Sequence, residues 1–301
     1  MNFQAIIKKY RRIVVLLSSH LRYFMEESIF FHIDVREIFN SKAPKTAKKI
    51  PKFVIGGLAK LINQDGINAF LKYNGDAKGT DFMNNAVKYF DVKLKVIGEN
   101  NLPENGMKCI FASNHPLGGM DGICLAAYLG NMYNGRIKYL VNDILYHLKP
   151  LQDIFVPVNK HGAQNRSAAR TLSDVLASDD QIITFPAGLC SRKNKSDICD
   201  LEWRKMFIVK AVEYKRDVVP VYFEGKNSNM FYNLANIRKK LGIKFNLEML
   251  LLPRELFKAK GSTFTIRCGK SIPWQTFNET KNPREWAEWV KGMVYNTVRN
   301  M

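Results

Sequence analysis

The sequence predicts an α/β protein in which a largely parallel, mixed sheet is flanked by helices and follows an N-terminal helical module. Two patterns indicate this fold class. From residue 93 onward, short apolar runs alternate with longer helix-like stretches, which is typical of strands joined by helices. Before residue 93, the apolar residues recur at helical spacing. A chain of 301 residues can hold one large domain and a smaller appendage.

Residues 1–32 have the pattern of a basic amphipathic helix. Apolar side chains recur at alternating steps of three and four and define one face, made of Ile7, Tyr10, Val14, Leu17, Leu21 and Phe24. Lysines and arginines lie beside this face, as they do in helices that rest in a membrane interface. A helix packed on the protein's own core would show the same stripe, so both placements stay open.

Residues 33–92 are predicted to form the helical module and residues 93–301 the α/β domain. Helical spacing in the module recurs at 34–39, 51–62 and 80–90. The strands expected in the domain are residues 108–112, 137–141, 181–185, 218–225 and 262–269. The helices expected between and after them are residues 121–133, 165–178, 201–214, 231–242 and 282–301.

The chain is strongly basic, with 46 Lys and Arg against 27 Asp and Glu and a formal net charge of +19. This charge predicts attraction to a polyanion, which can be a nucleic acid, an anionic bilayer surface or an acidic protein. No recognisable RNA- or DNA-binding signature accompanies the charge, which disfavours nucleic acid as the partner. No apolar run reaches the roughly 20 residues needed to cross a bilayer.

The five cysteines are scattered, and none has the spacing of zinc ligands. They predict reduced thiols in a cytosolic protein and no structural metal.

The stretch SNHPLGGMDG, residues 113–122, lies where a predicted strand ends and a helix begins. In a parallel sheet, ligands gather outside the carboxyl ends of the strands, so His115 and Asp121 stand where a site is expected. A neutral histidine can accept a proton at physiological pH, and a carboxylate can orient its ring and stabilise the charged form. The alternative is a His–Asp hydrogen bond that only stabilises a turn.

The order Asn-His-Pro…Asp at this junction resembles the first signature block of the glycerolipid acyltransferase family, in its variant Asn-His-Pro-x-Gly form. The usual spacing is four residues between His and Asp, whereas five separate them here. Three further stretches resemble the family's later blocks, in the same order: IFVPVNKHG at 154–162, TFPAGLCSRK at 184–193 and VVPVYF at 218–223. The family includes the 1-acylglycerol-3-phosphate acyltransferases.

The resemblance implies an O-acyltransferase that moves a fatty acyl group from a thioester of acyl-carrier protein or coenzyme A to the hydroxyl of a lyso-lipid. His115 would take the proton of the acceptor hydroxyl, and Asp121 would orient His115. Asn114 and Pro186 would support the site, with the side chain of Asn114 capping the turn that follows it. No cofactor beyond the thioester co-substrate and no metal are expected. The resemblance also implies a peripheral position on the cytoplasmic face of the inner membrane, consistent with the basic charge.

The third block departs from its usual Phe-Pro-Glu-Gly-Thr-Arg, because Ala187, Leu189 and Cys190 replace the glutamate, threonine and arginine. Two explanations are open. Arg192, through a shifted loop, can replace the missing guanidinium that holds a phosphate. Alternatively, the acceptor is not a lysophosphatidate but, for example, an N-acylated amino acid lipid with a free hydroxyl.

The acceptor-binding residues that follow from the resemblance are Arg192, Lys193, Lys160 and Gly188. A solvated basic loop is the alternative for Arg192 and Lys193, and an ordinary lysine after a strand is the alternative for Lys160. For the whole chain, the alternatives to an enzyme are an inactive membrane-bound scaffold of the same fold and a nucleic-acid-binding protein.

Overall fold

The structure is a computed structural model that describes residues 34–37, 51–141, 145, 148–158, 165–194, 197–243 and 246–301, with only the backbone at 165–169. The predicted amphipathic helix at 1–32 lies outside the described residues. Among the described helices, none is long and apolar enough to span a bilayer.

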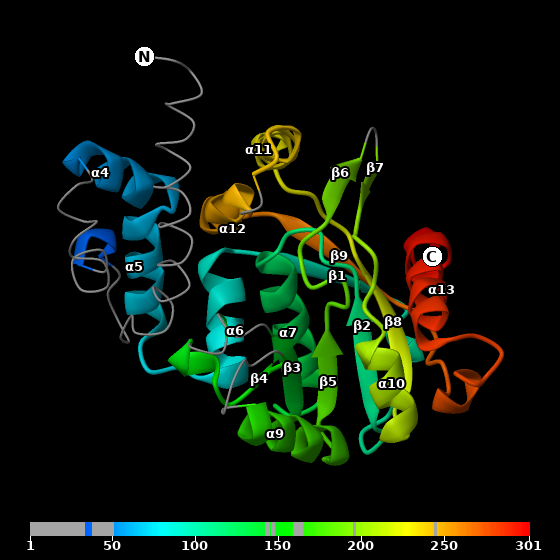
Figure 1. The fold of residues 1–301 in the computed structure, drawn as a ribbon. Coiled ribbons are helices and arrows are strands. Elements are labelled where there is room, and N and C mark those ends of the chain that lie inside the picture. Colours follow the sequence, from blue (N-terminus) through cyan, green and yellow to red (C-terminus); the bar gives the residue numbers. More distant parts are fainter. Residues whose placement is uncertain are drawn as a thin grey trace.

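Within the described residues, seven strands form one mixed sheet in the order β1-β9-β8-β2-β5-β3-β4 (Figure 1). The strands are β1 (Lys93–Ile97), β2 (Cys109–Ser113), β3 (Ile137–Val141), β4 (Phe155–Pro157), β5 (Gln181–Thr184), β8 (Asp217–Phe223) and β9 (Thr263–Cys268). Neighbouring strands are parallel except β8 and β9, which are antiparallel. The predicted fold class and the predicted strands are thereby confirmed.

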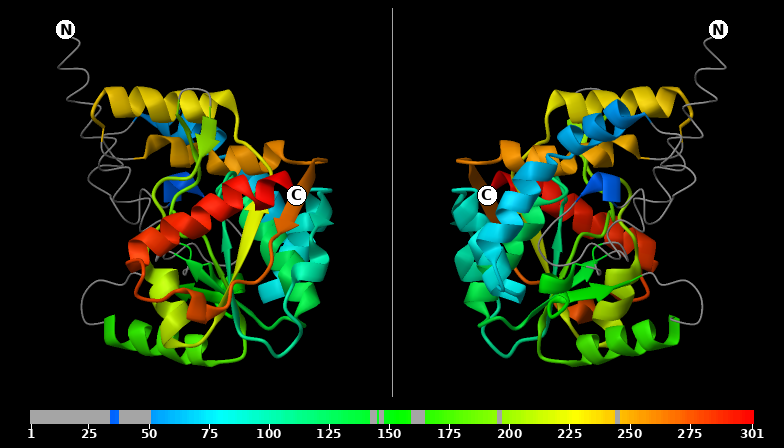
Figure 2. Two further views of the ribbon diagram at one scale, coloured as in Figure 1. Left: turned by 90° about the vertical axis from the view of Figure 1, so that its right-hand side faces the viewer. Right: turned by 90° about the vertical axis from the view of Figure 1, so that its left-hand side faces the viewer.

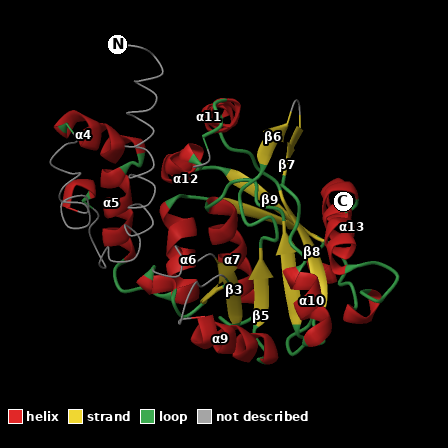
Figure 3. Ribbon diagram, in the orientation of Figure 1, coloured by secondary structure: helices red, strands yellow, loops and turns green. Residues whose placement is uncertain are grey.

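The described helices of the domain are α7 (Met120–Met132), α9 (Asn165–Ala177), α10 (Met206–Glu213), α11 (Asn229–Lys240), α12 (Leu252–Lys258) and α13 (Pro283–Asn296). Ahead of the sheet come α4 (Lys52–Leu61), α5 (Gln64–Asn74) and α6 (Gly79–Tyr89). A small antiparallel hairpin, β6 (Arg192–Asn194) and β7 (Asp197–Cys199), stands apart from the sheet (Figure 3).

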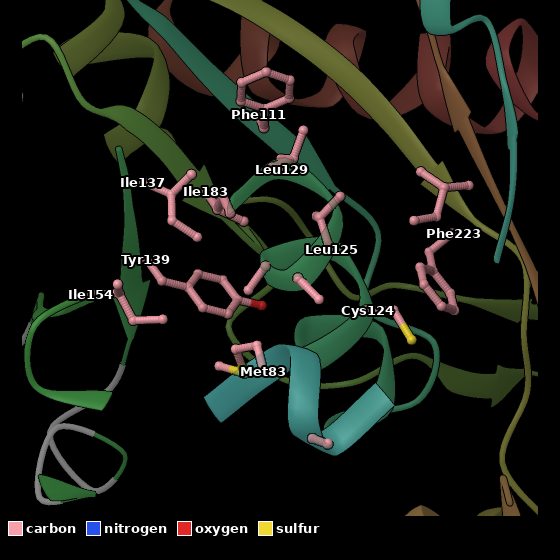
Figure 4. Packing of buried hydrophobic residues seen from close by; sticks show 14 of the residues in the cluster. Met83, Phe111, Cys124, Leu125, Leu129, Ile137, Tyr139, Ile154, Ile183 and Phe223 are labelled. Carbon is pink, nitrogen blue, oxygen red and sulfur yellow. The ribbon is translucent and has the colours of Figure 1, made fainter. Parts of the chain in front are cut away.

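Both faces of the sheet are covered by helices, as expected for parallel strands. Successive side chains of a strand point to opposite faces, so Phe111 of β2 joins one core and Ile110 joins the other. The first core includes Met83 of α6 and Leu125 of α7 (Figure 4). The second core lies under α10 and α13 and contains Trp286.

Residues of the predicted helical module share a core with the predicted α/β domain. Phe70 of α5, Phe82 of α6 and Phe90 belong to the same buried cluster as Phe111 and Leu125. The boundaries at residues 32 and 92 remain predictions, but the contacts of α5 and α6 attach this part of the chain to the sheet. The five cysteines, all in the described part of the chain, are free thiols, and only Cys199 among them is partly exposed.

Candidate active site

The loop of residues 114–119 joins the end of β2 to the start of α7, near the middle of the sheet. The neighbouring strands β5 and β8 run parallel to β2, so the segments that follow them begin at the same edge. Phe185 and Pro186 follow β5, and Asn227 lies shortly after β8. Because three loops meet at this edge, His115 lies where side chains from distant parts of the sequence converge.

His115 and Asp121 are in direct contact, with His115 Nδ1 and Asp121 Oδ2 separated by 2.9 Å. Since a carboxylate accepts hydrogen bonds, this contact places the proton of a neutral imidazole on Nδ1 and leaves Nε2 as a proton acceptor. The side chain of His115 is 17% exposed, whereas that of Asp121 is fully buried. The predicted pair is therefore assembled with only the histidine accessible from outside.

Backbone amides of the same loop surround the Asp121 carboxylate. Oδ2 accepts from the N–H groups of Leu117 (2.8 Å) and Gly118 (3.3 Å), and Oδ1 accepts from those of Gly119 (3.0 Å) and Gly122 (2.9 Å). Asp121 also lies in the first turn of α7, where a negative charge is favoured by the helix dipole. The carboxylate thus determines the fold of the loop as well as the orientation of His115.

Gly118, in the loop between His115 and Asp121, has a backbone conformation that favours glycine. Its φ angle of 74° lies in the left-handed region, which favours glycine. A Cβ atom at this position would also lie 3.0 Å from side-chain atoms of Cys190 and Leu252. The extra residue between His and Asp is accommodated by this turn, and the two side chains still meet.

An aromatic ring limits the orientations of His115 from one side. The rings of His115 and Phe185 are stacked, with centroids 4.0 Å apart and planes 18° apart. Phe185 comes from the third predicted block, directly after β5. The first and third blocks therefore contact each other through the proposed base.

The electrostatic environment favours the protonated form of His115. Burial would lower the pKa of the imidazole, but the charge and hydrogen bond of Asp121, with the charge of Asp200, outweigh it and raise the pKa above 6.5. Burial would likewise raise the pKa of Asp121, but His115 and the amides of Leu117 and Gly122 lower it below 3.8. Asp121 is accordingly ionised at neutral pH.

Asp200 is a buried carboxylate that the sequence analysis missed. Its Oδ1 accepts from the backbone N–H of His115 (3.2 Å) and from the Ser191 hydroxyl (2.6 Å), and its Oδ2 accepts from Trp203 Nε1 (3.0 Å). Burial raises the pKa of Asp200. Asp200 lies 85 residues from His115, and no local pattern in the sequence links the two.

Two asparagines connect the His115 loop to the segment after β8. Asn114 was expected to cap its own turn, but its side chain donates to the carbonyl of Phe223 (3.0 Å) and accepts from the N–H of the same residue (2.6 Å). Asn227 Nδ2 donates to the carbonyl groups of Pro116 (3.2 Å) and Leu117 (3.3 Å). Asn114 supports the site by joining the ends of β2 and β8.

Arg192 is close to the site but already has an anionic partner. Its Nη2 atom lies 3.0 Å from Glu248 Oε1, and the Glu248 side chain is fully buried. Arg238 also pairs with Glu248, at 2.8 Å. Because Glu248 is shared by Arg192 and Arg238, it holds the Arg192 guanidinium in place but neutralises only one of the two positive charges, so a role of Arg192 in binding the acceptor stays a prediction.

Of the other residues predicted for the site, Lys193, Gly188 and Pro186 belong to the third block and Lys160 to the second. Lys193 is partly exposed on β6, and Lys160 lies outside the described residues. Gly188 is exposed and has a φ of 68°. It ends a turn in which its N–H donates to the carbonyl of Phe185. Pro186 is buried, and its carbonyl accepts from the N–H of Arg204. The predicted roles, acceptor binding for Lys193, Lys160 and Gly188 and support of the site for Pro186, stay predictions.

The side chains that replace the usual polar groups of the third block are apolar or buried. Ala187 packs in the core under α10 and α13, and Cys190 packs against Phe231 and Tyr232 of α11. Outside this loop is a cleft of about 420 Å³, lined by Ala187, Leu189, Leu201, Glu202, Trp203, Arg204, Lys205 and Arg284. His115 does not line this cleft, so the cleft is separate from the proposed base.

Comparisons with known proteins place the chain in a family. The model of an acyltransferase family matches residues 37–300 of the chain. A lyso-glycine lipid O-acyltransferase of Bacteroides thetaiotaomicron is 51% identical over 271 residues, which cover 90% of this chain and 99% of that protein. The protein of the same name from Phocaeicola vulgatus is 50% identical over 271 residues, covering 90% of this chain and 97% of the relative.

Among solved structures, the chain is similar to the crystal structure of PlsC, a 1-acyl-sn-glycerophosphate (LPA) acyltransferase from Thermotoga maritima. The TM-score is 0.45 and the sequence identity 17%, and the match covers 95% of this chain and 96% of PlsC.

Proposed function

Because the chain belongs to the acyltransferase family, we propose that its substrate is a lyso-glycine lipid, whose free hydroxyl receives a fatty acyl group from a thioester. The observation that supports the chemistry best is the hydrogen bond between His115 Nδ1 and the buried, ionised Asp121. The identity of about one half with two lyso-glycine lipid O-acyltransferases supports the choice of acceptor.

In the proposed reaction, His115 Nε2 accepts the proton of the acceptor hydroxyl as the oxygen attacks the thioester carbonyl. The new C–O bond gives a tetrahedral intermediate. When this collapses, the C–S bond breaks and the thiol leaves with the proton held by His115. Asp121 keeps the ring oriented and stabilises the imidazolium formed between the two steps.

The third block supports an acceptor without a phosphate. An N-acylated glycine has a carboxylate in place of the phosphate of a lysophosphatidate, and so needs fewer charge-matched donors. Ala187 and Cys190 cannot supply such donors, and the Arg192 guanidinium is held in place by Glu248, which it shares with Arg238. The partly exposed Lys193 remains as a candidate for the carboxylate.

The donor is proposed to be acyl-carrier protein or coenzyme A carrying the acyl group. Both are anionic and fit the net charge of +19. We also place the enzyme at an anionic membrane surface, on its cytoplasmic face, because both the acceptor and the product are lipids.

The test is acyl transfer by the purified chain, followed by mass spectrometry of the lipid product. Lyso-glycine lipid and lysophosphatidate are offered together as competing acceptors, with acyl-carrier protein or coenzyme A thioesters as donors. We expect O-acylated glycine lipid with the parent and a background level with His115→Ala. Acylation of lysophosphatidate alone would contradict the proposed acceptor, and equal activity of His115→Ala would contradict the proposed base.

A further inference from the structure

The outer side of α11 carries a stripe of apolar side chains that nothing in the catalytic mechanism uses. Met230, Leu234, Ile237 and Leu241 follow one another at steps of four, three and four, which places them on one face of the helix. Met230 is 39% exposed, Ile237 54% and Leu241 58%, whereas Leu234 is partly buried. A separate face of the same helix, with Phe231 and Ala235, is buried.

Positive charge borders this stripe. Lys240, in the last turn of α11, is exposed on the flank of the stripe, and the sequence of the helix contains no acidic residue. Exposed Lys226 precedes the helix, and exposed Arg254 of α12 approaches the sulfur of Met230 at 3.9 Å. The nearby carboxylates are buried and already paired, Glu248 with Arg192 and Arg238 and Glu255 with Lys258.

The stripe is connected to the active site through the start of the helix. The N-cap of α11 is Ser228, whose hydroxyl accepts from the N–H of Phe231. The residue before it is Asn227, which bonds to the carbonyl groups of the His115 loop. A surface that contacted this helix would therefore lie next to the loop that holds the proposed base.

The same end of the molecule carries further exposed apolar surface. Figure 2 shows α4, α11 and α12 together at the end opposite α9. Phe53 of α4 is 78% exposed there. Leu61, at the end of α4, packs against the cluster that contains Phe231 and Tyr232 of α11.

We propose that the outer face of α11, with the stripe Met230, Ile237 and Leu241 and the nearby Lys226 and Lys240, docks on an anionic lipid bilayer. The apolar stripe enters the interface while the lysines contact lipid phosphates, the combination that holds amphipathic helices on membranes. The inference deepens the proposed function, because it names the surface through which a lipid acceptor would reach His115.

The first measurement is co-sedimentation of the full chain with vesicles of phosphatidylglycerol and phosphatidylcholine. The double variant Ile237→Asp/Leu241→Asp is compared with the control Met107→Asp. Met107 is 46% exposed and lies just before β2, at the end of that strand opposite the one that leads to His115. We expect the double variant to bind about tenfold less and Met107→Asp to bind as the parent does. Lys226→Gln/Lys240→Gln is expected to weaken binding and reduce its dependence on salt.

The second measurement separates docking from catalysis. Acyl transfer is assayed with the acceptor dispersed in detergent, where no bilayer is needed, and Ile237→Ser/Leu241→Ser serves as a milder second variant. We expect transfer in detergent to be retained by both stripe variants and transfer to vesicle-borne acceptor to fall.

Each outcome has a defined meaning. Parent-like vesicle binding by both stripe variants, or an equal loss by Met107→Asp, would overturn the docking face and leave the proposed reaction standing. A parent chain that transfers to no acceptor, with stripe variants that still lose vesicle binding, would refute the reaction but not the docking face.

Discussion

Asp121 links the folding of one loop to the proposed chemistry. Its carboxylate accepts from the amides of Leu117, Gly118, Gly119 and Gly122 and still reaches His115 Nδ1. A buried carboxylate needs such partners to stay ionised. Because the same partners are the backbone of the loop, the geometry of the base and the fold of the loop depend on one side chain.

The first prediction concerns the proton acceptor. His115→Ala is expected to lower kcat by about 10²- to 10⁴-fold, since general-base assistance contributes on that order. The kcat of Asp121→Asn is expected to fall by a similar factor, because an amide cannot accept all of the hydrogen bonds made to the carboxylate. The rates are measured with saturating donor and acceptor, and circular dichroism confirms that the His115 variant is folded. A folded His115→Ala with the parent rate would exclude the role given to the imidazole.

The second prediction concerns pH. Only neutral His115 can accept the proton, and its pKa is raised above 6.5, so activity rises with pH through an apparent pKa above this value. Asp200 contributes to that shift through its charge. Asp200→Asn is therefore expected to move the acidic limb of the kcat profile to lower pH.

The matched control for Asp200→Asn is Trp203→Phe, which removes one hydrogen bond to the carboxylate but leaves its charge. If Asp200 were only structural, both variants would lower thermal stability and neither would move the acidic limb.

The sequence was sufficient to identify His115 and Asp121 as a pair at the candidate site, but not to identify Asp200. The first two are six positions apart, so a local pattern at a strand end could pair them. Asp200 reaches His115 only because the β6–β7 hairpin returns the chain to the site after 85 residues. The expectation that Asn114 caps its own turn was wrong for the same reason, because its partner Phe223 is 109 residues away.

At the scale of elements, most of the strands that the sequence predicted have continuous apolar runs, and β9, with the sequence TFTIRC, is the exception. β2, β5 and β8 are buried over nearly their whole length. β1 alternates exposed and partly buried residues at one edge, β4 has three residues at the other edge, and β6 and β7 have three residues each. Such short or edge strands have too few apolar positions to give a clear period of alternation. Whether they form depends on pairing with strands that are distant in the sequence.

The end of α9 is held by Arg216, a fully buried residue just before β8. Its guanidinium donates to the carbonyl groups of Leu176, Ser178 and Asp180 and to that of Cys109 on β2. A cation at a helix C-terminus is also favoured by the helix dipole. Arg216 thereby fastens α9 to the end of β2 that lies farthest from His115.

The third prediction follows from this arrangement. Arg216→Met is expected to lower the free energy of unfolding by on the order of 3 kcal/mol, because buried carbonyl groups lose their donors. The folded fraction of Arg216→Met should keep the kcat of the parent, since Arg216 does not contact the site. Urea unfolding and the assay of acyl transfer check the two parts, with Arg170→Met, an exposed position on α9, as the control. An unchanged midpoint in Arg216→Met would refute the anchoring role.

At the scale of the whole molecule, the net charge of +19 bears on association with other molecules rather than on the fold. Like charges on one chain repel, and such a surplus is useful when the partners are anionic. The proposed partners, a bilayer surface and an acidic acyl donor, both fulfil this condition. Fields of this kind mainly raise the rate of encounter and are screened beyond about 10 Å at 0.1 M salt.

The last prediction therefore concerns salt. With acyl-carrier protein as donor and the acceptor in neutral detergent, kcat/KM is expected to fall by about tenfold between low salt and roughly 0.5 M salt. The chemical step occurs at a site where Asp121 is buried and His115 mostly so, hence kcat should change little. An acyl thioester of pantetheine, which has no charge, is the matched donor, and its kcat/KM should be nearly independent of salt. If both donors lost activity to the same extent, salt would be acting on the fold or on the site, and the positive charge would have no role in docking the donor.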